Sequence, residues 1–263
     1  TRLISNTNNG VKKMHRFFID QSTEINKKVI ISGNDYNHLK NSLRLNIGDR
    51  VILSDGNGFD MEAEIINFSN QGAELKILSK ERASVEPELK VWLAQGLPKK
   101  SKMDLIVEKS TEIGFAGLIP LESKRSIVKY DHKKKKKKRN RWHRVAEAAA
   151  KQSGRAVIPK IDNFYNSDNL KDLNDKFDYV LVLWEDEDSY SIKEFFKENK
   201  IESDADILVI IGPEGGFSSE EVDKFKSSLN AEVISLGPRI LRAETAGITA
   251  LTSILYEKGE LGD

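Results

Sequence analysis

The 263-residue sequence contains no cysteine and no long apolar run, and both absences narrow what the protein can be. Without cysteine, disulfide-stabilised scaffolds, cysteine-ligated zinc or iron–sulfur sites and thiol nucleophiles are excluded. No apolar stretch approaches the roughly 18–20 residues that span a membrane, and no secretory signal is recognisable. We therefore expect a cytoplasmic protein with no membrane partner, built as one large domain or two ordinary ones.

Several catalytic signatures are missing as well. The four histidines do not combine with acidic residues at metal-ligand spacing, so we expect no metal. The chain has no G-x-S-x-G nucleophile motif. Its most glycine-rich loop carries no following Lys-Ser/Thr pair and does not match the dinucleotide spacing G-x-G-x-x-G. Hydrolases with a serine nucleophile and P-loop enzymes are therefore disfavoured.

The near-zero net charge conceals an uneven distribution. The chain has 42 Lys and Arg residues against 41 Asp and Glu residues. Residues 124–144 hold 12 of the basic residues and only one acidic residue, Asp131, which leaves 30 basic and 40 acidic residues elsewhere. Such a run predicts either a solvated loop without a partner or a segment that binds a polyanion.

The N-terminal third is patterned as short strands. Residues 1–13 are polar and aperiodic, and we interpret them as a disordered extension or an artificial remnant outside the fold. Strands are predicted at 50–54, 59–68 and 73–78, with turns at 55–58 and 70–72 between them. A short helix is expected within 38–45. This spacing predicts a small β-barrel over residues 14–85.

From residue 86 onward, strands and helices alternate, which predicts a mostly parallel sheet with helices on both faces. Capping boxes are predicted at Ser101–Asp104 and Ser218–Glu221. The expected strands are 89–94, 118–121, 179–184, 207–211 and 232–236, and the expected helices are 103–113, 142–154, 219–229 and 243–257.

Unusual residues gather in three segments at predicted strand ends, 183–185, 211–217 and 236–246, where open α/β sheets bind ligands. Glycines in the second segment allow backbone groups to approach a ligand closely, although an ordinary strand–helix turn would explain them too. Glu214 would repel phosphate, so a neutral or cationic adenosyl ligand suits this loop better. In the third segment, Arg242 and Glu244 either form a reactive site or simply pair with each other, and Thr245 is either a site residue or an ordinary residue of a helix N-terminus.

The combination of motifs resembles the RsmE family of the SPOUT superfamily. The matching segments are Met14-His15-Arg16-Phe17-Phe18, His38-Leu39 through Leu43-Arg44-Leu45, residues 147–155, Ile211-Gly212-Pro213-Glu214-Gly215-Gly216-Phe217 and Leu236-Gly237-Pro238-Arg239-Ile240-Leu241-Arg242-Ala243-Glu244-Thr245-Ala246. The resemblance implies a PUA-like β-barrel over 14–85 that binds RNA. It also implies a SPOUT-type α/β methyltransferase domain over 86–263 with a deep trefoil knot, and a homodimer. The implied activity is S-adenosylmethionine-dependent methylation of uridine N3 in 16S rRNA of the small ribosomal subunit.

Transferred position by position, the resemblance implies roles for individual residues. The residues implied for catalysis are Arg239, Arg242 and Glu244. Those implied for cofactor binding are Leu183, Glu185, Gly212, Pro213, Glu214, Gly215, Gly216, Leu236, Gly237, Ile240, Leu241, Thr245 and Ala246. RNA contacts are expected from Arg16, Arg44, Lys99, Arg125, Lys133, Lys134, Lys135, Lys136, Lys137, Lys138 and Arg155.

Two other functions remain open at this stage. A non-catalytic RNA-binding protein on a degenerate methyltransferase scaffold would not bind S-adenosylmethionine. A SPOUT methyltransferase acting on tRNA or another rRNA base would bind it and modify a different nucleotide. The sequence identifies no general base.

Overall fold

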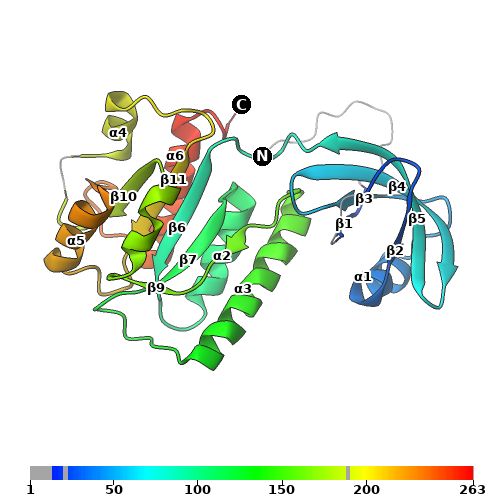
Figure 1. The fold of residues 1–263 in the computed structure, drawn as a ribbon, viewed down its shortest axis with the longest axis horizontal. Coiled ribbons are helices and arrows are strands. Elements are labelled where there is room, and N and C mark those ends of the chain that lie inside the picture. Colours follow the sequence, from blue (N-terminus) through cyan, green and yellow to red (C-terminus); the bar gives the residue numbers. More distant parts are fainter. Residues whose placement is uncertain (1–13, 20–22, 188–189, 263) are drawn as a thin grey trace. The chain divides into compact units, whose positions relative to one another are not determined.

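The structure is a computed structural model that describes residues 14–19, 23–187 and 190–262. The expected N-terminal extension, residues 1–13, lies outside the described residues. The chain divides into two compact units, Thr1–Ser84 and Val85–Asp263. In Figure 1 the first unit runs from blue to cyan, and the second runs from cyan-green to red.

The first unit contains one five-stranded sheet in the order β1-β3-β4-β5-β2. β1 and β3 are parallel, and the other neighbours are antiparallel. Its elements are β1 (Arg16–Phe18), β2 (Lys28–Ile31), α1 (Gly33–Asn37), a π-helical turn (His38–Ser42), β3 (Arg50–Ser54), β4 (Phe59–Ser69) and β5 (Gly72–Arg82). This is the small β domain expected from the sequence. No pairing joins β1 to β2 in the described residues, so the strands form an open sheet and not a fully closed barrel.

Alternating side chains on β4 build the core of this unit. Met61, Ala63 and Ile65 are fully buried, and the residues between them are partly exposed, as expected for a strand with one covered face. They pack in one cluster with Phe17 and Leu39. The helix predicted within 38–45 begins earlier, at Gly33, and ends in the π-helical turn.

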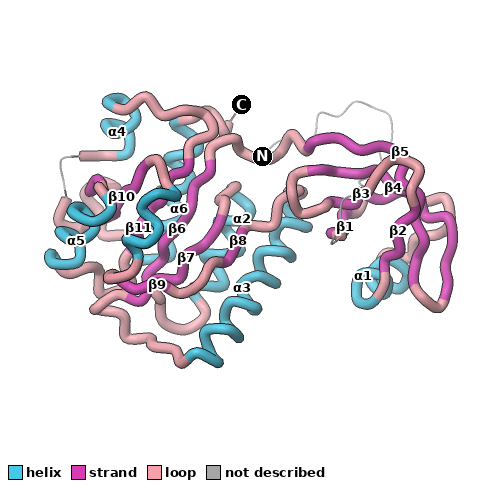
Figure 2. Tube along the Cα trace, viewed as in Figure 1, coloured by secondary structure: helices cyan, strands magenta, loops and turns pink. Residues whose placement is uncertain are grey.

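The second unit is an α/β domain with a parallel sheet, also as expected. The strand order is β12-β10-β11-β6-β7-β8, and β9 also pairs with β7. Figure 2 shows helices and strands alternating along this part of the chain. Its elements are β6 (Lys90–Gly96), α2 (Lys102–Ile113), β7 (Gly117–Glu122), α3 (His132–Ser153), β8 (Lys160–Ile161), β9 (Tyr165–Asn166), the 3-10 helix η2 (Leu170–Lys176), β10 (Tyr179–Leu183), α4 (Ile192–Glu198), β11 (Asp206–Ile211), α5 (Ser219–Leu229), β12 (Glu232–Ile234) and α6 (Ala243–Glu257).

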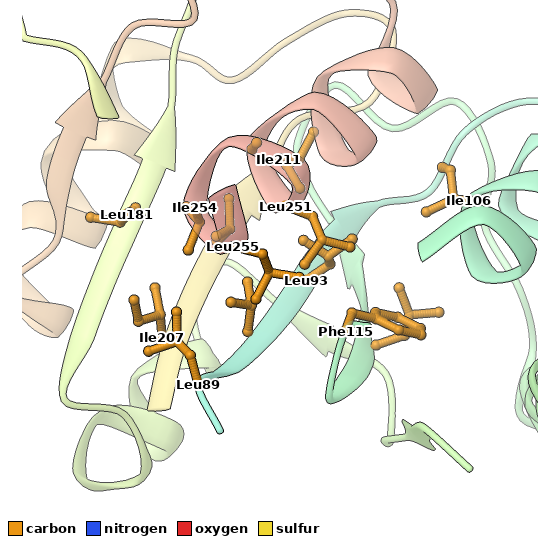
Figure 3. Packing of buried hydrophobic residues seen from close by; sticks show 14 of the residues in the cluster. Leu89, Leu93, Ile106, Phe115, Leu181, Ile207, Ile211, Leu251, Ile254 and Leu255 are labelled. Carbon is orange, nitrogen blue, oxygen red and sulfur yellow. The ribbon is translucent and has the colours of Figure 1, made fainter. Parts of the chain in front are cut away.

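The central strands are buried on both faces, as their continuous apolar runs predict. On β11, Ile207, Val209 and Ile211 belong to one apolar cluster, to which α2, α3, α4 and α6 contribute. Leu208 and Ile210 face a second cluster, formed with α5 and η2. Figure 3 shows the first cluster between the strands and α6. The trefoil knot stays a prediction, because strand order and pairing do not define how the chain crosses itself.

The interpretation of the lysine run as a loop is wrong, because residues 133–138 lie inside α3. Asp131 caps this helix by accepting a hydrogen bond from the backbone N–H of Lys134 at 2.7 Å, and lysine itself is a good helix former. Further along, Trp142 and Ala146 anchor the helix in the core. Packing and capping therefore outweigh the repulsion between neighbouring lysines.

Of the two predicted capping boxes, only the second forms. The hydroxyl of Ser218 accepts a hydrogen bond from the backbone N–H of Glu221, and the carboxylate of Glu221 accepts one from the backbone N–H of Ser218. Ser101 makes no side-chain cap on α2. No helix in the described part of the chain is long and apolar enough to cross a membrane.

Candidate active site

A cavity of about 630 Å³ opens at the carboxyl ends of β10, β11 and β12. The three segments singled out by sequence follow these strands, and they meet around this cavity because parallel strands end at the same edge of a sheet. The predicted residues that line it are Leu183, Glu185, Gly212, Pro213, Glu214, Gly216, Leu236, Gly237, Arg239, Ile240, Leu241, Arg242 and Ala246. Gly215, Glu244 and Thr245 do not line it.

The glycine loop after β11 is held against the end of β6. A Cβ atom added to Gly96 would lie 2.4 Å from the backbone nitrogen of Pro213, so the two segments touch through backbone. Within the loop, the N–H of Gly216 donates to the carbonyl of Pro213 at 2.9 Å. Gly216 has φ +64° and lies beside the Glu185 carboxylate, so both its backbone conformation and its surroundings favour glycine.

Hydrogen bonds to the buried Glu221 side chain connect the start of α5 to the segments that contain Ser167 and Lys124. This side chain is 1% exposed and accepts hydrogen bonds from the Ser167 hydroxyl at 2.7 Å and the Lys124 backbone N–H at 2.8 Å. Burial by itself would raise the pKa of Glu221, but these donors and Ser218 outweigh it and hold the pKa below its usual value near 4.5. The carboxylate is therefore the form that the fold requires.

Replacing Glu221 with glutamine is expected to lower the free energy of unfolding by about 1–3 kcal/mol, because an amide cannot satisfy all of these donors. The folded-state pKa lies below the unfolded one, so the carboxylate's stabilisation is present above about pH 4.5 and is lost as the pH falls through the folded value. Thermal unfolding from pH 7 to pH 3 should therefore show a shallower pH dependence in the variant. Identical profiles for the two proteins would contradict this assignment.

In the third segment, Glu244 pairs with Lys102 and not with Arg242. Lys102 Nζ lies 3.1 Å from Glu244 Oε2 and 3.1 Å from Glu214 Oε1, and this double ion pair joins the middle of the glycine loop to the start of α6. Both carboxylates raise the pKa of Lys102, and the hydrogen bond to Glu244 has the larger effect. Among the described residues no carboxylate pairs with Arg239 or Arg242, and both arginines are exposed at the cavity. The simple Arg242–Glu244 pair left open by the sequence is therefore excluded.

The residues at this cavity suit an adenosyl cofactor with a sulfonium group. The volume lies within the range of small-molecule sites. Apolar side chains, including Leu236 and Ile240, lie beside glycine backbone, and Glu185 and Glu187 supply carboxylates that favour a cation.

Comparison with known proteins follows the same division of the chain. The profile of the RNA methyltransferase domain family matches residues 85–255, and that of the RNA methyltransferase PUA domain family matches residues 31–78. Ribosomal RNA small subunit methyltransferase E of Bacillus subtilis is 33% identical over 93% of this chain and 97% of its own length. The chain belongs to the RsmE family.

Solved structures agree with this RsmE assignment. Ribosomal RNA small subunit methyltransferase E of Neisseria gonorrhoeae, bound to S-adenosylmethionine, is 26% identical and covers 92% of this chain and 97% of its own, with a TM-score of 0.80. A Legionella pneumophila protein in complex with the same cofactor is 29% identical, and the match covers 93% of this chain and 98% of the other, again with a TM-score of 0.80. Both structures span the two units of the RsmE chain described here.

Sequence reasoning missed several residues that line the cavity of this RsmE protein: Lys102, Trp184, Glu187, Phe217 and Ser235. Trp184 and Phe217 lie inside the segments 183–185 and 211–217 but were not named individually, and Glu187 and Ser235 lie just outside the predicted segments. Lys102 comes from a different element. Lys102 follows the carboxyl end of β6, and β6 lies next to β11 in the sheet. That position in the sequence could have indicated that Lys102 lies near the site.

Two arginines expected to contact RNA are engaged inside their own units. Arg155 is 6% exposed, forms an ion pair with Glu86 at 2.7 Å and donates to the carbonyl of Phe115 at 2.9 Å. Arg16 is held by Asp60 and Ser54, with its side chain 14% exposed. These contacts engage both guanidinium groups in holding the fold, and the RNA contacts expected of the two arginines stay predictions.

The other expected RNA contacts lie on the surface or at the edge of a cavity. Arg44, Lys99 and Arg125 are exposed, and the Arg125 guanidinium also donates to the carbonyl of Gly215 at 3.1 Å. The six lysines of the run differ in their surroundings. Lys135 pairs with Glu122 at 2.6 Å, whereas Lys134 and Lys138 lie over the ring of Tyr130.

Proposed function

We propose that this protein transfers a methyl group from S-adenosylmethionine to N3 of a uridine in 16S rRNA of the small ribosomal subunit. The observation that carries the proposal is the convergence of the glycine loop and the 236–246 segment on one cavity in a chain of the RsmE family. Relatives with the same fold are named as small-subunit rRNA methyltransferases, and two related structures contain S-adenosylmethionine.

The cofactor would be held by the loops after β10, β11 and β12. Glycine backbone at Gly212 and Gly216 allows close approach, and Leu236, Ile240 and Leu241 offer apolar contacts. When bound, S-adenosylmethionine supplies an activated methyl group. With the donor already activated, the protein's main contribution is to bring the acceptor nitrogen into line.

Arg242 and Arg239 are suited to stabilising the uracil base that accepts the methyl group. Uracil N3–H is weakly acidic, so the nitrogen reacts best when its proton is leaving and negative charge spreads onto the neighbouring carbonyl oxygens. A guanidinium without a carboxylate partner can stabilise that charge, and both arginines meet this condition among the described residues. Glu244, fixed by Lys102, would orient the nucleotide or its neighbours.

Replacing Lys102 with glutamine is expected to reduce kcat/KM for methyl transfer by about 10–100-fold, because Glu214 and Glu244 lose the cation that positions both loops. The melting temperature should change little, since the side chain is partly exposed. Lys102→Arg should recover part of the activity. The matched control is Lys100→Gln, an exposed lysine two residues away that does not line the cavity. Equal activities of Lys100→Gln and Lys102→Gln would contradict the positioning role.

Two measurements test the function itself. Calorimetric titration with S-adenosylmethionine should show binding, and its absence would favour the non-catalytic RNA-binding alternative. Mass-spectrometric mapping of methylated nucleosides should show 3-methyluridine missing from 16S rRNA of a deletion strain and restored by adding the gene back. Loss of a different modified nucleoside would overturn the uridine-N3 assignment and leave a methyltransferase with another target.

The proposal includes the homodimer that the family resemblance implies, with an active site that draws on both subunits. Sedimentation equilibrium should report twice the monomer mass of 29.7 kDa. A monomer that retains full single-turnover activity would contradict this part of the proposal.

A further inference from the structure

A second cavity, of about 420 Å³, lies beside the N-terminal half of α3. Its wall combines α3 side chains with Ile161, the last residue of β8, and with Asn163 and Phe164 just beyond it. In the sheet order, β8 stands at the opposite end from β12, so this α3 cavity belongs to a different edge of the domain from the candidate active site. No carboxylate is among the residues that line it.

The α3 side chains at this cavity form one stripe of the helix. His132, Lys136, Arg139 and His143 recur at intervals of three or four residues, which places them on the same face. Lys133 and Lys137, from the same run, are exposed and do not line the cavity. The lysine run is therefore divided by helical geometry into residues that face the cavity and residues that do not.

Arg139 is fixed at the cavity by neutral partners. Its Nη1 donates to Asn163 Oδ1 at 2.7 Å and its Nη2 to the carbonyl of Ile161 at 3.4 Å. Its Nε is buried and has no acceptor. Among the described residues no carboxylate pairs with this guanidinium, so its full positive charge is retained in a preorganised position.

The remaining cations contribute unequally to this charge. Lys135 is neutralised by Glu122, and its ammonium lies 5.3 Å from the centre of the Phe164 ring. It therefore forms part of the cavity wall but adds little to the net charge of the cavity. Lys136 makes no ion pair within the described part of the chain, and its ammonium adds a second uncompensated charge beside Arg139. Two such charges in a concave, carboxylate-free site favour an anion.

We propose that the α3 cavity binds a backbone phosphate of the substrate RNA, with Arg139 and Lys136 as its principal ligands. The inference rests on the proposed function for the identity of the RNA. An RNA phosphate is favoured over a free one because the same helix continues the positive charge outside the cavity, at Lys133 and Lys137. A phosphate contact carries no sequence information, so the site would set the position of the RNA while the uridine is recognised at the other cavity.

The test compares two pairs of substitutions that remove the same charge from the same helix: Lys136→Gln/Arg139→Gln at the cavity and Lys133→Gln/Lys137→Gln outside it. Affinity for a 16S rRNA fragment is measured at several salt concentrations. The cavity pair should weaken binding at least about tenfold more than the control pair, and losing a phosphate contact should lower the salt slope by roughly 0.7–0.9. Equal weakening by both pairs, or none, would overturn the proposal.

Affinity for S-adenosylmethionine should be unchanged in both pairs, and a wild-type protein that bound no cofactor would refute the proposed function and not this site. The single variant Lys136→Gln, which leaves the Arg139 contacts intact, should show part of the same loss even if the double variant is less stable. If inorganic phosphate raises the melting temperature of the wild type while RNA affinity is equal in both pairs, the ligand is free phosphate and the proposal fails.

Discussion

Replacing Arg242 with alanine should slow single-turnover methyl transfer by roughly 10²–10³-fold while leaving S-adenosylmethionine affinity within about threefold. The side chain is exposed at the cavity, and no carboxylate among the described residues neutralises it. Its charge is therefore available for the negative charge that develops on uracil as N3 loses its proton. Such an interaction strengthens only as the reaction proceeds, so its loss affects the rate more than binding.

Stability is not expected to account for this effect. Arg242 precedes α6 and caps it without a side-chain hydrogen bond, so the helix keeps its backbone contacts in the variant. Arg144→Ala, an exposed arginine on α3, removes the same charge elsewhere and should retain activity near the wild-type level. Arg242→Lys should fall between alanine and the wild type, because it keeps the charge without the planar guanidinium. Wild-type rates for Arg242→Ala would remove this residue from the mechanism.

The second large effect is expected from Gly96→Ala, with affinity for S-adenosylmethionine reduced at least about tenfold and a lower melting temperature. A Cβ at Gly96 would lie 2.4 Å from the nitrogen and 2.6 Å from Cδ of Pro213, and 2.7 Å from the carbonyl carbon of Gly212. All three atoms belong to backbone or to a proline ring, so no flexible side chain can move aside. The glycine loop itself has to shift, and with it the wall of the candidate active site.

Gly154→Ala is the matched control for this substitution. Gly154 ends α3 with φ +81°, and a Cβ atom added there would have no other atom within 4 Å, so alanine meets no clash but is strained by about 1 kcal/mol. The control should lose some thermal stability and retain cofactor affinity. If Gly96→Ala also binds the cofactor like the wild type, the contact between β6 and the glycine loop does not shape the site.

Features that depend on near neighbours were predicted well. The capping box at Ser218 and Glu221 formed, and Ser218 has the extended backbone (φ −77°, ψ 154°) typical of a capping residue. Ser101 has a different backbone conformation (φ −99°, ψ 13°), and the box predicted there did not form, although the helix did. The apolar runs of β10 and β11 correctly predicted strands buried on both faces.

Features that depend on distant partners were predicted poorly. Arg155 was expected to contact RNA, and its enclosure by Glu86 and backbone carbonyls was not foreseen. The run 133–138 was interpreted as a solvated loop from its composition, but it lies inside α3, whose packed stripe begins beyond the lysines. Glu244 was considered a partner of Arg242, whereas Lys102 from another element occupies that role.

By itself, the sequence determined the family, the division into a PUA-like β unit and a parallel α/β unit, and the three strand-end segments that form the candidate active site. These follow from periodicities and motifs that act over a few residues. Only the tertiary structure decided which carboxylates Lys102 joins, which arginines are buried, and that one stripe of the basic helix lines a cavity. Those outcomes depend on residues that are remote in sequence, and folding brings them together through the packing of the sheet and its helices.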